Sequence, residues 1–265
     1  MSFLKTDKMA ARKDKHVGWI TFNNPARHNA VSLEMWQGLA DIAHEFARDD
    51  DIRVVVVHGA GEKAFVSGAD ISEFAQQRNS AEATEKYDAV AQEGTQALKN
   101  LNKPTMAMID GYCIGGGVAI ALNCDMRIAA DHSRFAVPAA KLGLGYEYDG
   151  VCKLVDVVGP SFAKEIFFTA RQFSASEALA MGLINRMVPK EDLLAYVQQY
   201  AETIAANAPM TVASIKTIVG EIVKDESVRD VAHCDQLVAA CFNSADFTEG
   251  RTAFMEKRTP TFKGR

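Results

Sequence analysis

Residues 110–120 read Asp-Gly-Tyr-Cys-Ile-Gly-Gly-Gly-Val-Ala-Ile, and three consecutive glycines stand where a strand gives way to an apolar helix. Glycines carry no side chains that would shield the unpaired N–H groups of a first helical turn. Such a helix start favours negative charge, including charge that develops only during a reaction. Close helix packing is the alternative reading. The spacing Gly111-x-x-x-Gly115-Gly-Gly does not match the Gly-x-Gly-x-x-Gly of a dinucleotide site.

A second turn of small residues precedes this one in the chain. Residues 63–71 read Lys-Ala-Phe-Val-Ser-Gly-Ala-Asp-Ile and follow the β-branched run 53–58. Small residues after a buried strand let a ligand approach the backbone closely. The two turns therefore predict a ligand site that is built largely from main-chain groups.

The segments around these turns predict an α/β core. Residues 53–58 contain four consecutive valines and residues 103–109 end in the apolar stretch Met-Ala-Met-Ile, as is typical of buried parallel strands. Residues 16–23 alternate as a half-buried strand does, and residues 127–130 form a shorter strand. Residues 81–100 read as a helix between two of these strands. This alternation of strand and helix favours mostly parallel pairing.

The last third of the chain reads as helical. Helices are predicted for residues 161–170, 176–181, 191–207 and 211–223, and for the tail 227–256. We therefore expect a core over residues 1–200 and a helical C-terminal region over residues 201–265.

Composition excludes several classes of protein. The chain has 265 residues, 48% of them hydrophobic and 24% charged, which is ordinary for a globular protein. A net charge of −5 gives no footprint for nucleic acid. An apolar run of about 18 residues, as a membrane span needs, is absent, and so is a secretory signal at the first residues. Five scattered cysteines without a Cys-x-x-Cys pair predict neither a metal site nor a disulfide framework, so we expect a reducing cytoplasm.

Further segments carry a specific resemblance. Residues 24–32 read Asn-Pro-Ala-Arg-His-Asn-Ala-Val-Ser, residues 169–178 read Thr-Ala-Arg-Gln-Phe-Ser-Ala-Ser-Glu-Ala, residues 181–185 read Met-Gly-Leu-Ile-Asn, and residues 253–258 read Ala-Phe-Met-Glu-Lys-Arg. Together with the two glycine-bearing turns, these segments resemble, in order and over essentially the whole chain, the motifs of the enoyl-CoA hydratase/isomerase (crotonase) superfamily.

The resemblance implies a fold and a reaction. The fold would be an α/β spiral of ββα units with a C-terminal trimerisation region, giving a homotrimer or a hexamer. The N–H groups of Ala69 and Gly116 would point at the thioester oxygen of an acyl-CoA. Two preorganised donors stabilise an enolate oxyanion, each commonly by about 3 kcal/mol. Coenzyme A would enter as part of the substrate, with no separate cofactor.

The resemblance also implies where the coenzyme A part would bind. The loop 26–30 and the backbone of residues 65–69 would accept its nucleotide end, and two C-terminal residues would reach it from a neighbouring subunit, Lys257 as a phosphate partner. The candidate residues are Ala26, Arg27, His28, Ala30, Phe65, Ser67, Gly68, Asp70, Ile71, Phe254 and Lys257. Phe65, Ile71, Phe74 and Tyr148 are candidates for the acyl pocket, with core packing as the alternative.

The chain departs from the familiar hydratases at two positions. Where those enzymes carry the two glutamates that hold a water, this chain has Ala119 and Ala139. Alanine cannot move a proton, so the two-glutamate mechanism is excluded. The next loop is unusual instead, because residues 141–150 include two carboxylates and two phenols. Glu147 falls where some isomerases and dehalogenases of the superfamily carry a catalytic aspartate, and Tyr146 where a decarboxylase carries a tyrosine.

Three functions stay open from the sequence. In the first, a hydratase or double-bond isomerase uses Glu147 as its acid/base. In the second, a decarboxylase or eliminating lyase uses Tyr146 to orient the leaving group. In the third, the chain binds acyl-CoA without turnover. Asp149 is a further candidate without a counterpart in the superfamily. The alternative for Tyr146, Glu147 and Asp149 is a solvent-facing loop or the cap of the next helix.

Overall fold

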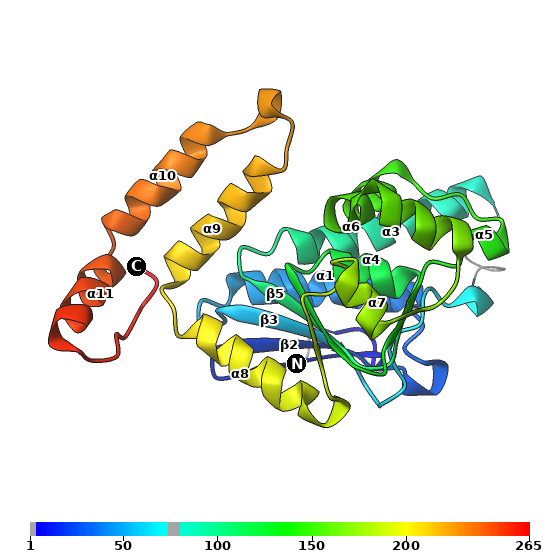
Figure 1. Ribbon diagram of the computed structural model, residues 1–265, viewed down its shortest axis with the longest axis horizontal. Coiled ribbons are helices and arrows are strands. Elements are labelled where there is room, and N and C mark those ends of the chain that lie inside the picture. Colours follow the sequence, from blue (N-terminus) through cyan, green and yellow to red (C-terminus); the bar gives the residue numbers. More distant parts are fainter. Residues whose placement is uncertain (1–3, 74–79) are drawn as a thin grey trace.

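The computed structural model describes residues 4–73 and 80–265. An α/β core occupies most of the chain, and a group of C-terminal helices stands beside it (Figure 1). Among the described residues, no helix is long and apolar enough to cross a membrane.

A six-stranded sheet forms the centre of the core, in the order β1-β2-β3-β5-β7-β10. Only β1 and β2 pair antiparallel, and each later neighbour pairs parallel. The strands are β1 Met9–Asp14, β2 Val17–Phe22, β3 Val54–Gly59, β5 Thr105–Ile109, β7 Met126–Ala130 and β10 Arg186–Val188. The mostly parallel α/β core predicted from the apolar runs is confirmed.

Both faces of this sheet are covered, because its strands send side chains to two separate clusters. Along β2, Ile20 and Phe22 enter the main core, whereas Val17 and Trp19 enter a second cluster on the opposite face. Helix α8 (Leu193–Ala205) covers that second face, and helices α1 (Leu33–Arg48) and α3 (Ala81–Lys99) lie on the first. The alternation predicted for residues 16–23 is therefore observed.

A second, smaller sheet has the order β4-β6-β8-β9. Three of its strands continue from a strand of the first sheet after a short turn, and a helix follows, so the chain repeats a strand–strand–helix unit. The elements are β4 Ala64–Val66, β6 Tyr112–Ile114, β8 Arg134–Ala136 and β9 Phe173–Ser174, with helices α4 Gly116–Leu122, α5 Ala139–Leu142 and α7 Ala175–Ala180. The spiral of ββα units expected from the resemblance is confirmed.

Helix α6 (Tyr148–Thr169) begins thirteen residues before the helix predicted at 161–170. It is interrupted at Gly159, whose φ of 74° is left-handed, immediately before Pro160. Proline interrupts a helix but can stand in its first turn, so Pro160 predicts only the start of the second half of α6, the part that follows Gly159. The structure thus places Asp149 in the first helical turn and leaves Glu147 as the N-cap residue.

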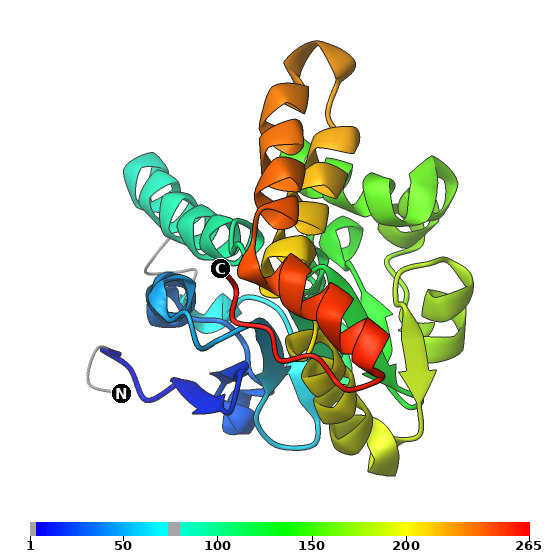
Figure 2. The ribbon, with the colours of Figure 1, turned by 90° about the vertical axis from the view of Figure 1, so that its left-hand side faces the viewer.

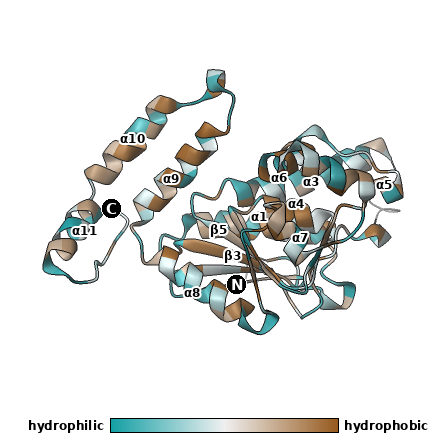
Figure 3. Cartoon of the chain, viewed as in Figure 1, coloured by the Kyte–Doolittle hydropathy of each residue, from teal (hydrophilic) through white to brown (hydrophobic). Residues whose placement is uncertain are grey.

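The C-terminal region consists of helices α9 (Pro209–Ile222), α10 (Val231–Phe242) and α11 (Ala245–Glu256). Helices α9 and α10 run side by side and project from the core, as both views show (Figures 1 and 2). Their surfaces carry many hydrophobic positions (Figure 3). The helices predicted for this part of the sequence are observed.

Candidate active site

The amide of Ala69 is oriented by the backbone of Val31. The N–H of Val31 donates to the carbonyl of Gly68 at 2.8 Å, and the N–H of Asp70 donates to the carbonyl of Val31 at 2.9 Å. These two bonds form an isolated parallel bridge between Val31 and Ala69. In such a bridge the neighbours of Ala69 make both bonds, so its own N–H and C=O lie on the opposite side. The Ala69 N–H therefore points away from Val31.

Gly116 approaches the nitrogen of Ala69 closely. It is the first residue of α4, with Gly115 as N-cap, so its N–H has no partner inside the helix. A methyl group built on Gly116 would lie 3.5 Å from the nitrogen of Ala69. Neither N–H donates to another described residue. The two amides predicted to act together are thus brought together by the fold.

Two neighbouring glycines make this approach possible. Gly115 has a φ of 51°, which an L side chain rarely adopts, and its N–H donates to the carbonyl of Ala136 at 2.8 Å. At Gly117, a methyl group would lie 2.2 Å from the carbonyl oxygen of Val66 in β4. The glycine run therefore lets α4 start directly against the segment that leads from β4 to Ala69.

Two converging amides in a half-buried place can stabilise a negative oxygen. Their backbone is held by a helix on one side and by the bridge to Val31 on the other, so they need little reorganisation when charge develops. Small or apolar residues surround them. The ring of Pro138 would lie 4.0 Å from a methyl group on Gly115, and the next residue, Ala139, is buried. Ala119 is half-buried in α4.

A hollow of about 360 Å³ lies next to β4, whose first residue, Ala64, lines it. Its lining residues come from the first loop, from the turn between β3 and β4, and from the end of β10, and they are Pro25, His28, Ala60, Glu62, Lys63, Ala64 and Lys190. Lys190 pairs with Glu62 at 3.1 Å, and this hydrogen bond raises the pKa of Lys190. The hollow thus combines apolar walls with ammonium groups that suit a phosphate.

The first loop is tied to the Ala69 segment by side chains as well. Arg27 donates to the carboxylate of Asp70 at 3.1 Å and to the hydroxyl of Ser72 at 2.5 Å. Partial burial raises the pKa of Asp70, but the bonds from Ser72 and Arg27 outweigh it and leave that pKa lowered. Ala26, Arg27 and His28 are exposed on the loop. Arg27 and Asp70 therefore form a contact across the predicted ligand-binding segments.

The other residues predicted to contact the ligand differ in how far they are exposed to solvent. The Phe65 side chain is fully buried beside Phe22, so it offers a ligand only its backbone. Ile71 is 60% exposed, and Ser67 is half-buried with its N–H bonded to the carbonyl of His28. Phe74 lies outside the described residues. Among these, Ile71 is the one whose exposure suits an acyl chain.

The polar loop lies on the surface. Every residue from 141 to 149 is exposed, and the Glu147 carboxylate makes no capping bond to α6. The Tyr146 side chain is 40% exposed but packs edge-on against Phe167 with 4.9 Å between ring centroids, and this partial burial raises the pKa of its phenol. Tyr148 is 82% exposed. Tyr146 therefore anchors the loop to α6, while Glu147 and Asp149 face solvent in the single chain.

Phe254 and Lys257 lie at the end of α11, which belongs to the C-terminal helices beside the core (Figure 1). Phe254 is 82% exposed. Lys257 is the C-cap of α11 and has a left-handed φ of 55°. Both side chains are exposed in the single chain.

Some residues around the site were not predicted. Asn29 is fully buried and donates to two carbonyls beside the hollow, and Lys63 and Lys190 line that hollow. Asn29 and Lys63 stand inside the quoted motif segments, so their positions were a usable signal. Lys190 follows a short strand far along the chain, and its sequence carries no such signal.

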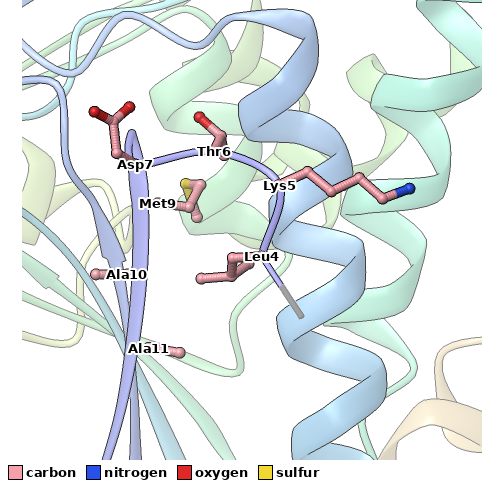
Figure 4. A pocket seen from close by; sticks show the side chains of 7 residues that line it. All are labelled: Leu4, Lys5, Thr6, Asp7, Met9, Ala10 and Ala11. Carbon is pink, nitrogen blue, oxygen red and sulfur yellow. The ribbon is translucent and has the colours of Figure 1, made fainter. Parts of the chain in front are cut away.

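A second hollow is formed by N-terminal residues alone, namely Leu4, Lys5, Thr6, Asp7, Met9, Ala10 and Ala11 (Figure 4). Met9 packs tightly on α1, because a methyl group on Gly38 would lie 2.9 Å from its Cγ. This hollow contains no predicted site residue. Among the described residues, no three His, Cys, Asp or Glu side chains are grouped so that they could hold a metal ion.

Comparison with known proteins finds relatives that match nearly the whole chain. Residues 12–265 match the family described as Enoyl-CoA hydratase/isomerase. The chain is 32% identical over 255 residues to the short-chain-enoyl-CoA hydratase of Clostridium acetobutylicum, covering 96% of this chain and 97% of that protein. It is also 32% identical to the carnitinyl-CoA dehydratase of Escherichia coli K12, covering 93% and 94% of the two chains.

Solved structures agree. A crystal structure from Magnetospirillum magneticum, described as an enoyl-CoA hydratase/carnithine racemase, superposes with a TM-score of 0.92 at 33% identity and covers 99% of this chain and 98% of that one. An enoyl-CoA hydratase from Bacillus anthracis gives a TM-score of 0.92 at 31% identity, covering 98% and 100%.

Proposed function

The chain belongs to the enoyl-CoA hydratase/isomerase family, the crotonase superfamily, and on that premise we propose that it acts on enoyl- or acyl-CoA thioesters through an enolate held by Ala69 and Gly116. The observation that carries this proposal is the 3.5 Å approach between the Ala69 nitrogen and a methyl position on Gly116. The relatives named as hydratases and a dehydratase support a CoA thioester as the substrate. In this proposal the two N–H groups bind the thioester oxygen in the ground state and more strongly as it becomes negative.

The coenzyme A part extends, in this proposal, from the two amides to the hollow beside the first loop. His28, Lys63 and Lys190 border that hollow, and the lysines suit a nucleotide phosphate. In this proposal, Phe254 and Lys257 of a neighbouring copy contact the same ligand, and this contact accounts for their exposure in the single chain. The exposed apolar side chains of α9 and α10 form the self-association surface of a homotrimer or a hexamer.

The test is solvent-deuterium incorporation at the α-carbon of a panel of acyl- and enoyl-CoA thioesters, with Gly116→Ala as the variant. The new methyl group meets its nearest neighbour at an ordinary 3.5 Å, so the chain should fold normally. In this proposal the methyl group, 3.5 Å from the Ala69 nitrogen, crowds the oxygen that the two amides would bind. We expect exchange to slow by about 100-fold, as for the loss of one oxyanion donor.

The matched control is Gly220→Ala in α9, where a methyl group meets nothing within 4 Å. Its exchange rate should equal that of the wild-type protein. Full exchange in folded Gly116→Ala would contradict the proposal. Tight binding of thioesters without exchange in the wild-type protein would favour either decarboxylation or binding without turnover.

Glu147 is the proposed acid/base for hydration or isomerisation, because a carboxylate on an exposed loop can approach a bound acyl group when the loop covers it. Glu147→Gln should abolish exchange, whereas Glu93→Gln, an exposed glutamate of α3, should not alter it. Asp149→Asn tests the second carboxylate of the same loop. Unchanged exchange in Glu147→Gln would remove Glu147 from the mechanism.

A second candidate, decarboxylation or elimination, is favoured by the small and apolar surroundings of the two amides. Pro138, Ala139 and Ala119 supply no proton carrier there. Decarboxylation needs the oxyanion donors but no base. Tyr146→Phe keeps the ring contact with Phe167 and removes the hydroxyl that would orient the leaving group. Release of carbon dioxide from a carboxyacyl-CoA, slowed in Tyr146→Phe, would establish this reaction.

A further inference from the structure

Asn29 has every polar atom of its side-chain amide engaged. It is fully buried, and its Nδ2 donates to the carbonyl of Ala60 at 2.9 Å and to that of Ala64 at 2.8 Å. Its Oδ1 accepts from the N–H of Asn24 at 2.9 Å. Two donors and one acceptor in this arrangement are available from a side-chain amide and not from a carboxylate or an apolar group.

The bonds of Asn29 join two parts of the chain that both border the hollow. Pro25 and His28 stand on one side of it, and Ala60 and Ala64 stand on the other. Asn29 connects those sides from inside the protein. Its backbone continues two residues later into Val31, whose bridge orients the Ala69 amide. The same short segment therefore holds both the hollow and one of the two converging N–H groups.

The local backbone is shaped for this contact. Asn29 has a left-handed φ of 55°, a conformation that asparagine adopts more readily than most residues. Gly59 leaves room for its amide, because a methyl group there would lie 2.6 Å from Nδ2. Leucine or aspartate at position 29 would leave two carbonyls unpaired in the interior, which is unfavourable.

We propose that Asn29 is a positioning residue that fixes the Ala69 amide opposite Gly116 and holds it at a set place relative to the hollow. This inference rests on the proposed function, since it concerns the same oxyanion site. Asn29 is fully buried and acts on a ligand only through the backbone of Val31, Ala60 and Ala64.

The test measures the carbonyl of a bound thioester directly. Butyryl-CoA labelled with ¹³C at the carbonyl is added at saturation, and its C=O stretch is recorded by difference infrared spectroscopy. Two N–H donors weaken that bond and lower its frequency relative to the free thioester. Because the site is saturated, the measured frequency does not depend on the affinity for the thioester. It also does not depend on global stability as long as the protein remains folded.

The variants are Asn29→Asp, which keeps the shape but cannot donate, and Asn29→Gly, which tolerates the left-handed φ without strain. The glycine variant serves if the buried carboxylate prevents folding. The control is Asn23→Asp, the same chemical change at an exposed asparagine whose Nδ2 donates to the carbonyl of Asp7 at 2.9 Å. We expect both Asn29 variants to lose most of the frequency shift and to exchange α-protons about tenfold more slowly or worse.

The outcomes separate the inference from its premise. A shift in the wild-type protein and in Asn23→Asp that is lost in the Asn29 variants supports the positioning role. An equal shift in wild type and in folded Asn29→Gly overturns it and leaves the proposed function intact. The absence of any shift in wild type with bound thioester overturns the proposed function itself, and the inference with it.

Discussion

The three glycines at 115–117 meet different surroundings, so the same substitution has a different consequence at each. A methyl group on Gly116 fits, whereas one on Gly117 would lie 2.2 Å from the carbonyl oxygen of Val66. Backbone cannot move aside as a flexible side chain does. We expect Gly117→Ala to lower the free energy of unfolding by about 3 kcal/mol, the upper part of the usual range for overpacking.

Denaturant unfolding of Gly117→Ala beside Gly220→Ala checks this, since the control methyl group meets open space. A midpoint for Gly117→Ala equal to that of the control would show that α4 and β4 can separate without loss. It would then weaken the claim that these two elements fix the distance between the donors.

Lys257 occupies a left-handed position that glycine normally fills at a helix end. Lys257→Gly should therefore raise the free energy of unfolding by about 1 kcal/mol, because the strain of a side chain at positive φ is removed. The proposed role of its ammonium group requires that the same variant bind coenzyme A more weakly. Lys257→Ala is the control, because it loses the ammonium group and keeps the strain.

Unfolding experiments and titration with coenzyme A separate the two effects. Weaker binding in both variants, with a gain of stability only in Lys257→Gly, is the expected pattern. Undiminished binding in both would remove Lys257 from the proposed ligand site.

At the scale of single residues, Ala69 and Gly116 are named by the resemblance to the superfamily, whose motifs mark both positions; the structure brings their backbones close together, and their role as donors remains a proposal. The sequence does not predict the role of Asn29, because that side chain bonds to carbonyl groups more than thirty positions away in the chain. The surface position of Glu147 depends on where α6 begins, and the helical pattern before Pro160 was not recognised.

Among the elements, α11 and the tail that follows it are joined by a carboxylate. Glu249 accepts from Arg258 at 2.7 and 2.9 Å and from the N–H of Thr261 at 2.8 Å. The hydrogen bond from Arg258, followed by that from Thr261, lowers the pKa of Glu249 from its ordinary 4.5 to about 2. The folded protein therefore binds a proton at this carboxylate less readily than the unfolded chain does.

The sign of the pH effect follows from that difference. The contribution of Glu249 is complete above pH 4.5 and is lost as the pH falls toward about 2. Urea unfolding at a series of pH values should show wild type more stable than Glu249→Gln at neutral pH, with the difference shrinking over that acid range. A difference independent of pH would mean that the carboxylate charge is not what holds the tail.

For the elements, sequence reasoning succeeded where a pattern was long. The strands at 53–58 and 103–109 are predicted by their continuous apolar stretches, and the helix at 81–100 by its length between two strands. The strands of the second sheet were expected only through the resemblance and not from a residue pattern, because β4, β6 and β8 have three residues each and show no period. Those short strands place both glycine-bearing turns, so the site geometry could not be obtained without the structure.

For the whole molecule, the C-terminal helices carry more exposed apolar surface than a single chain needs. Ile215, Val219 and Ile222 of α9 are each more than half exposed, at spacings that place them along one side of the helix. We expect Val219→Glu to dissociate the proposed oligomer, because a buried unpaired carboxylate opposes association.

Sedimentation velocity checks this, with Leu194→Glu in α8 as control, since Leu194 and Val219 are both 53% exposed. Association that is lost in Val219→Glu and kept in Leu194→Glu would place the contact on the C-terminal helices. A wild-type protein that sediments as a monomer would contradict the proposed assembly. The sequence predicted these helices, but their projection from the core depends on what covers them, which no local pattern encodes.

The two converging donors belong to the main chain, and this has a consequence for how the site can be probed and how it can change. An alanine scan passes over Ala69 altogether, because that residue already is alanine, and among the natural replacements only proline deletes the N–H, at the cost of fixing φ and restricting Gly68. An ester link in place of the peptide bond before Ala69 would remove the hydrogen-bonding group without that backbone constraint. If these amides bind the thioester oxygen as proposed, substitutions of the surrounding side chains could change the reaction without removing either donor.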